Sequence, residues 1–224
     1  MKLYYHPAST TCRMVQMFAL DEGINLDYEL VDLFSGAQHA PEYKRINPSG
    51  LVPVLVDGDF TLTESAAILR YLAEKYGSAA YPKDLKARAH VNEVMDWFNA
   101  NFYKDFGYGL VYAQVFPHHK RPNPDCQAGT VEWGRDKAQR WIKILDESLI
   151  GPSHGYVCGD SITIADYLGI EMVTVGDLIG CGWASYPNIA RWIGTMKARR
   201  NWGKTHEAFN GFAASLRGNS FATV

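Results

Sequence analysis

A serine stands three positions before a cysteine near the amino terminus, in the run Ser9-Thr10-Thr11-Cys12-Arg13. The run opens a predicted helix, whose free N–H groups and dipole favour a negative charge such as a thiolate. Ser9 could donate a hydrogen bond to that charge, or it could only cap the helix. The spacing also resembles a redox Cys-x-x-Cys whose attacking cysteine has become serine. Cys12 alone cannot close that disulfide, so it has either a residual redox role or a buried structural one.

A turn-forming segment, Asn47–Pro53, precedes an apolar run that has the composition of a strand. A proline that enters a strand from such a turn is a candidate for a cis peptide bond, although most X-Pro bonds are trans. A cis bond at Val52-Pro53 would leave the backbone N–H and C=O of Val52 free to hold an extended peptide ligand by strand-like pairing. The alternative is an ordinary trans proline in a turn.

The tripeptide Thr63-Glu64-Ser65 opens the next predicted helix and combines a carboxylate, hydroxyls and free N–H donors. A ligand that carries both an ammonium and a carboxylate could bind there. Ser65 and the N–H groups would contact the carboxylate, and Glu64 the ammonium. The same residues could equally be a solvated helix cap.

The elements that must position these residues follow from hydrophobic periodicity and from turn signals. A short strand at 3–5 precedes a helix at 11–22, and an alternating strand at 26–33 completes a β-α-β unit. The turn Asp57-Gly58-Asp59 predicts an antiparallel hairpin between 54–56 and 60–62. A helix then runs from Thr63 to Gly77, and the order that we expect for this part of the chain is βαβαββα.

The rest of the chain has only helical patterns, so we expect an α/β domain at 1–77, a linker at 78–84 and an all-helical domain at 85–224. The predicted helical stretches run over 85–115 and 128–149, with a turn-rich break at 118–124, and shorter helices follow Thr163, Pro187 and Asn201.

Composition narrows the classes of function. The 224 residues are 47% hydrophobic and 21% charged, as in soluble globular proteins, and the net charge of -2 offers no attraction to nucleic acid or anionic membrane. The four cysteines show no metal-ligand or disulfide spacing, which fits a reducing compartment. We see no signal peptide and no membrane-spanning stretch, so we expect a cytoplasmic protein without a bound metal.

Taken together and in this order, these motifs resemble the cytosolic glutathione transferase superfamily, nearest to its serine-type theta-like and delta-like members, including bacterial ones. The likeness covers the whole chain, because a segment of the second domain also resembles the capping box of that family. The matching positions are Ser9 with Cys12-Arg13, Asn47-Pro48 with Val52-Pro53, Glu64-Ser65 before Ala67-Ile68, and Gly159–Asp166.

The resemblance implies a thioredoxin-like first domain and a homodimer, with glutathione as co-substrate. It implies that Ser9 donates a hydrogen bond to the glutathione thiolate and that Val52, beside Pro53, pairs with the cysteinyl backbone. Glu64 and Ser65 would hold the γ-glutamyl group. In the second domain, Thr163 would cap a helix and Asp166 would accept the Thr163 N–H, which are structural roles.

The chain departs from the family pattern where the glycine carboxylate of glutathione would bind. Theta-like and delta-like members usually offer a basic residue just before the Val-Pro pair, whereas Gly50 and Leu51 stand here. Gln38 or His39 could replace part of that role, and His39 could also be a solvated surface residue. Ala66 stands where delta-like members often carry a larger polar residue.

The second domain would supply the pocket for a hydrophobic co-substrate. The segment 97–108 is dense in aromatic residues, and we expect Phe102, Phe106 and Tyr112 to line the pocket, although aromatic stripes on helices are more often core. Three functions remain open: a detoxifying transferase that adds glutathione to small apolar electrophiles, a non-catalytic protein that binds glutathione or apolar ligands, and a glutathione-dependent thiol reductase. Ser9 at the redox position disfavours the third.

Overall fold

The computed structural model describes residues 1–224 and has one mixed four-stranded sheet in the order β2-β1-β3-β4. Strands β1 and β2 are parallel, and β3 runs antiparallel to both β1 and β4. Leu3 lies opposite half-buried Tyr28 on one side and buried Leu55 on the other, so the register centres on Leu3 and Leu55 in the core. The strands are β1 (Lys2–Tyr5), β2 (Asp27–Leu30), β3 (Val54–Asp57) and β4 (Phe60–Leu62).

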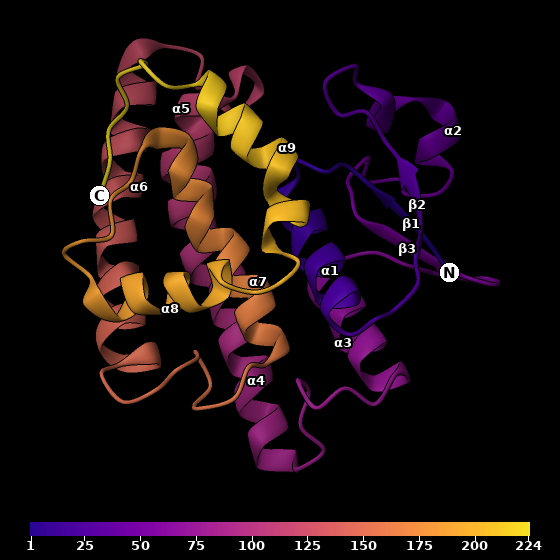
Figure 1. Ribbon diagram of the computed structural model, residues 1–224. Helices are drawn as coiled ribbons and strands as arrows, with labels where there is room; N and C mark the ends of the chain where they lie inside the picture. The colour runs from indigo at the N-terminus through magenta and orange to yellow at the C-terminus, as the bar shows by residue number, and fades with distance from the viewer.

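Three α-helices and one 3-10 turn complete this first domain. The predicted order βαβαββα is confirmed, and the predicted hairpin is formed by β3 and β4. Its fold is the thioredoxin-like one, and Figure 1 shows its sheet on the right of the molecule. The elements are α1 (Thr10–Asp21), η1 (Ala37–His39), α2 (Pro41–Lys44) and α3 (Ser65–Lys75).

The second domain is all helical, and its helices begin and end close to the predicted limits. A continuous run covers Leu85–Val115, and later helices start after Thr163, Tyr186 and Asn201. The elements are α4 (Leu85–Trp97), η2 (Phe98–Tyr112), α5 (Ala113–Val115), η3 (Pro117–His119), α6 (Pro124–Ile144), η4 (Leu145–Ile150), α7 (Ile164–Thr174), η5 (Val175–Ile179), α8 (Pro187–Lys197) and α9 (Trp202–Ser215).

The middle of the long first helix of this domain, η2, is a π-helix of 15 residues. The π form is rare and occurs mostly as single turns inside α-helices. Element η2 packs closely on α6 through two glycines, since a Cβ on Gly134 would lie 2.5 Å from the carbonyl carbon of Gly109. The close approach of these two helices therefore requires glycine at 134.

The two domains share one hydrophobic core, and α1 lies at their boundary against α7 and α9 (Figure 1). Phe18 of α1 meets Tyr167 of α7 edge to face, with ring centroids 5.3 Å apart. No helix or strand lies between α3 and α4, where we predicted the linker. This segment packs on the second domain, because the Ala80 carbonyl accepts the Ile164 N–H at 2.9 Å.

Helix α7 begins at a cap built around a buried carboxylate. The buried Asp166 carboxylate accepts the Thr163 N–H at 2.8 Å, as predicted, and also the Thr163 hydroxyl at 3.0 Å. It accepts two more donors, the Val157 N–H and the Trp192 indole N–H, both at 2.9 Å. The carboxylate therefore joins the start of α7 to the preceding loop and to α8.

No helix of the structure combines the length and the apolar character that crossing a membrane requires.

Candidate active site

Ser9 is the N-cap of α1, in an extended conformation with φ -71° and ψ 126°. Its hydroxyl oxygen accepts the Cys12 N–H at 3.4 Å, which is long for a capping bond. The N–H groups of Thr10 and Thr11 have no acceptor in the structure. A half-buried hydroxyl and two free N–H donors thus face the same end of the helix, where its dipole favours an anion.

The Ser9 hydroxyl lies beside the backbone of Val52. Ser9 Oγ is 3.1 Å from Thr11 Oγ1, and the Thr11 hydroxyl donates to the Val52 carbonyl at 3.0 Å. Because Thr11 uses its proton on Val52, Ser9 donates within the hydroxyl pair, and it could turn that proton to a stronger acceptor. The Val52-Pro53 bond is cis, and the Val52 N–H has no acceptor.

The start of α3 leaves its polar groups unpaired in the same way. Glu64 has an exposed carboxylate, and neither it nor the buried Ser65 hydroxyl has a hydrogen-bond partner. Glu64 is also the only residue other than glycine with positive φ, at 63°. Such a conformation costs about 1 to 3 kcal/mol and occurs most often at functional sites. The surroundings of α3 therefore fix Glu64 in a strained conformation that aims its carboxylate outward.

Cys12 is buried with no exposed surface, behind the first turn of α1. Burial raises the pKa of its thiol to about 11, although the hydrogen bonds with Ser9 and the His6 backbone act in the opposite direction. The His6 N–H donates to Cys12 Sγ at 3.5 Å. The structural interpretation of Cys12 agrees with this environment, because a buried protonated thiol is a poor nucleophile.

Gln38 and His39 lie next to the segment that contains the cis proline. Their side chains are 3.3 Å apart, between Gln38 Nε2 and His39 Nε2. Gly50 has φ 63°, and a Cβ there would come within 3.0 Å of the Gln38 carbonyl oxygen. A side chain at position 50 would therefore be strained and crowded.

Two of the three residues predicted to line the pocket for a second substrate do not do so. Phe102 and Phe106 are 0% exposed and pack against each other, with ring centroids 5.1 Å apart. Their side chains lie in the hydrophobic core that the two domains share. Tyr112 is buried as well, but its hydroxyl lies 2.9 Å from Thr10 Oγ1, next to Ser9.

A different set of aromatic side chains lies near Ser9, and we call it the aromatic surface. Phe34 is 69% exposed and Tyr108 is 45% exposed, so both offer rings to solvent. The set is linked by ring contacts between 5.1 and 5.9 Å and comprises Phe34, Phe212, Phe116, His119 and Tyr108, with Tyr112 behind it.

The aromatic surface approaches Ser9 from both domains. The Phe34 ring lies 5.1 Å from that of His6, whose carbonyl accepts the Ser9 N–H. Burial, the neighbouring Tyr112 and the charge of Glu64 raise the pKa of Tyr108. Sequence reasoning missed this surface because its members are far apart in the chain. The only local signal was the group Phe116, His118 and His119, at the start of the turn-rich break.

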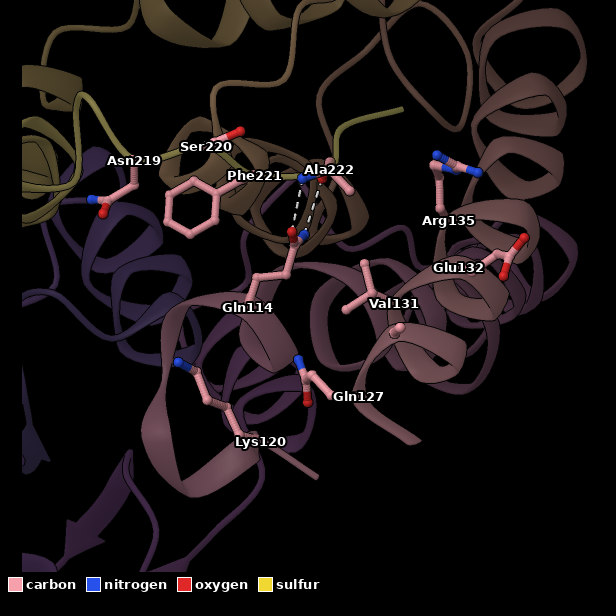
Figure 2. A pocket seen from close by; sticks show the side chains of 11 residues that line it. Gln114, Lys120, Gln127, Val131, Glu132, Arg135, Asn219, Ser220, Phe221 and Ala222 are labelled. Atoms are coloured by element: carbon pink, nitrogen blue, oxygen red, sulfur yellow. Dashed lines mark hydrogen bonds between the residues drawn. The ribbon is translucent and has the colours of Figure 1, made fainter. Parts of the chain in front are cut away.

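The cavity in Figure 2 lies elsewhere, between α6 and the C-terminal tail, and has a volume of about 680 Å³. Two hydrogen bonds between the Gln114 side chain and the backbone of Ala222, at 3.0 and 2.8 Å, hold the tail there. None of the predicted site residues lines this cavity. The structure has no group of three or more His, Cys, Asp or Glu side chains that could hold a metal ion.

The sequence matches two family models in the order of its two domains. Residues 3–80 match the glutathione S-transferase N-terminal domain, and residues 112–200 match the glutathione S-transferase C-terminal domain. The chain therefore belongs to the glutathione transferase family and is an enzyme of that family.

Characterised relatives agree over nearly the whole chain. A dichloromethane dehalogenase from Methylophilus leisingeri is 31% identical over 208 residues, which cover 90% of this chain and 77% of that protein. The human theta-2 glutathione transferase, solved with glutathione, superposes with a TM-score of 0.86 at 28% identity, covering 100% and 93% of the two chains. A delta-class enzyme from Nilaparvata lugens gives a TM-score of 0.80 at 31% identity, covering 96% and 98%.

Proposed function

We propose that this enzyme activates the glutathione thiol with Ser9 and directs the thiolate at small apolar electrophiles. The observation that carries the proposal is the start of α1, where the Ser9 hydroxyl and the unpaired N–H groups of Thr10 and Thr11 converge. All three are donors, so the group that they suit is an anion.

The energy of these donors is sufficient for the task. A free thiol has a pKa of about 8.5, so only a few per cent is ionised at neutral pH. A hydrogen bond to a charged group contributes about 1.5 to 3 kcal/mol, and about 1.36 kcal/mol corresponds to one pKa unit. One hydroxyl and a helix N-terminus can therefore make the thiolate the major species. Ser9 keeps its own proton and is neither nucleophile nor base.

Glutathione would lie across the starts of α1 and α3. Val52, with a free N–H beside Pro53, would pair with the cysteinyl backbone, and Glu64 and Ser65 would hold the ammonium and carboxylate of the γ-glutamyl group. Gln38 and His39 would take the glycine end. Their position against Gly50 supports this assignment.

The aromatic surface supports a planar apolar electrophile, and the dehalogenase among the relatives supports a halide as the leaving group. The thiolate sulfur would form a bond to the carbon that carries the halogen. The carbon–halogen bond would break, and the halide would leave with the electron pair. No redox step is involved.

The test is the Ser9→Ala variant, assayed with a chloronitrobenzene over a range of pH. We expect kcat/KM at neutral pH to fall about 10- to 100-fold, the effect of losing about 1.5 to 3 kcal/mol. The acid limb of the profile should move to higher pH, because the bound thiol regains a higher pKa. Binding of glutathione, measured by calorimetry, should change less than about threefold. Unchanged turnover would remove Ser9 from the mechanism.

The same assay separates the two alternatives. A non-catalytic binding protein would bind glutathione but would not turn over any halide, epoxide or enone in an activity panel. A thiol reductase would reduce a mixed disulfide of glutathione, and this activity would require a reactive cysteine near Ser9. Buried Cys12 does not support that function.

We also propose that the chain forms a homodimer in the cytoplasm, as the resemblance implies. Sedimentation equilibrium of the purified protein and fractionation of the producing cells are the corresponding measurements. A monomer in sedimentation equilibrium would contradict the proposed homodimer.

A further inference from the structure

Both neighbours of Ser9 in the chain are held by hydrogen bonds that connect to the second domain, Thr10 directly and Ala8 through Arg13. The Ala8 carbonyl accepts Arg13 Nη1 at 2.8 Å, and Thr10 Oγ1 lies 2.9 Å from the Tyr112 hydroxyl. Ser9 itself is half buried and has no contact of this kind. Ser9, the residue proposed to activate the thiol, therefore lies between two residues that hydrogen bonds hold in place.

The contact on the Thr10 side is part of a buried row of three hydroxyl groups. The Tyr103 hydroxyl lies 2.6 Å from that of Tyr112, which in turn meets Thr10. Burial raises the pKa of both tyrosines, so their phenols keep their protons at neutral pH. A buried hydroxyl without a partner costs about 1 to 3 kcal/mol, so the row holds Thr10 in one place.

The contact on the Ala8 side leads to two further helices. Arg13 is fully buried, and its Nε donates to Glu171 of α7 at 2.8 Å. The same guanidinium lies over the Phe209 ring of α9, with 3.8 Å from Cζ to the ring centroid. His206 of α9 contacts Glu171 as well, with 3.1 Å between His206 Nε2 and Glu171 Oε2. Helices η2, α7 and α9 all contribute to these two contacts.

We propose that the Tyr112 hydroxyl is a positioning group for the reaction. It fixes Thr10, and through Thr10 it sets the direction of the Ser9 hydroxyl and of the free N–H groups at the start of α1. This inference rests on the proposed role of Ser9. Hydrogen bonds weaken steeply as their angle closes below about 120°, so a small rotation of this turn would lower the thiolate population. The second domain then contributes to thiol activation as well as to electrophile binding.

The test is Tyr112→Phe, which removes one oxygen and keeps the ring. We expect kcat/KM at neutral pH to fall about three- to tenfold, the effect of one neutral hydrogen bond. The acid limb of the pH profile, and the pH at which the ultraviolet absorbance of the bound thiolate appears, should rise by about half to one unit. The dissociation constant of glutathione should stay within about twofold.

Tyr167→Phe is the matched control. The Tyr167 hydroxyl also joins α7 to α1, donating to Asp21 Oδ2 at 3.0 Å, but at the opposite end of α1 from Ser9. We expect it to leave the pH profile unchanged. Thr10→Val, which removes the same hydrogen bond from the other partner, should reproduce the Tyr112→Phe shift and serves if that variant folds poorly.

The outcomes separate this inference from the proposed function. An unmoved acid limb in both Tyr112→Phe and Thr10→Val, with a moved limb in Ser9→Ala, would overturn the positioning role alone. An equal shift in Tyr167→Phe would also overturn it, because any loosening of α1 would then suffice. Full activity of Ser9→Ala would overturn the proposed function itself.

Discussion

The starts of α1 and α7 use similar residues for opposite purposes. At α7, the Thr163 hydroxyl and N–H both donate to the buried Asp166, and the Ile164 N–H donates to the Ala80 carbonyl of the segment between the domains. At α1, the Ser9 hydroxyl makes only weak or exchangeable bonds, and the next two N–H groups have no acceptor. A cap whose hydroxyl and N–H are both paired with a buried carboxylate stabilises the fold, whereas a cap whose hydroxyl remains exchangeable can bind a ligand.

The start of α3 belongs with that of α1. It has free donors, a carboxylate without a partner and a strained Glu64. The contrast therefore separates two helix starts in the first domain, both open, from one in the second domain, which is closed. Substitutions at the closed start should affect stability, and those at the open starts should affect binding or turnover.

The largest effect is expected for Asp166→Ala. Four donors would lose a buried carboxylate, so the free energy of unfolding should fall by about 3 to 5 kcal/mol. Urea denaturation followed by circular dichroism measures this change. Asp160→Ala is the control, because the Asp160 side chain is 83% exposed. A loss below about 1 kcal/mol would mean that the cap is not a major contributor to stability.

The next effect concerns binding at α3. Glu64→Ala should weaken glutathione binding about 10- to 100-fold, since a charge-assisted hydrogen bond contributes about 1.5 to 3 kcal/mol. The KM for the electrophile should stay the same. Glu207→Ala, an exposed carboxylate on α9, is the comparison variant. Equal dissociation constants for Glu64→Ala and the wild type would rule out Glu64 as the partner of the ammonium.

A smaller effect distinguishes the two hydroxyl caps by stability alone. Thr163→Ala should cost about 1 kcal/mol, which is typical of an N-cap, and Ser9→Ala about half of that, because its capping bond is long. Thermal unfolding of both variants in parallel gives the difference. If Ser9→Ala proves the more destabilising of the two, the interpretation that the Ser9 hydroxyl is only weakly engaged in capping α1 is wrong.

The smallest effect is expected at Cys12. Burial raises the pKa of its thiol to about 11, so the reactive thiolate is scarce at neutral pH. Iodoacetamide should label exposed Cys126 readily and Cys12 only in unfolded protein, with turnover unaffected. Mass spectrometry of the labelled peptides measures this. Rapid labelling of native Cys12 would contradict this expectation and would mean that the hydrogen-bond donors at the start of α1 also stabilise the Cys12 thiolate.

The glutathione side of the site was open to prediction because each of its parts is local. A helix start, a turn before a strand and a second helix start each have their own sequence signal, as in Ser9, Val52-Pro53 and Glu64-Ser65. The aromatic side of the site could not be predicted in this way, because periodicity indicates which face of a helix is buried but not which element covers that face. Phe102 and Phe106 were therefore assigned to a pocket, and Phe34 and Phe212 were overlooked.

The sequence by itself determined the order of elements, the helix starts and the residue types at each of them, because these depend on local propensity and on the alternation of apolar residues. The tertiary structure decided which caps are used up and which remain free, since this depends on what a distant segment brings to each helix end. Asp166 meets all its donors within its own domain. Ser9 instead lies beside Thr10, which meets Tyr112 of the second domain, and beside Ala8, which is held by Arg13, itself paired with Glu171 of the second domain.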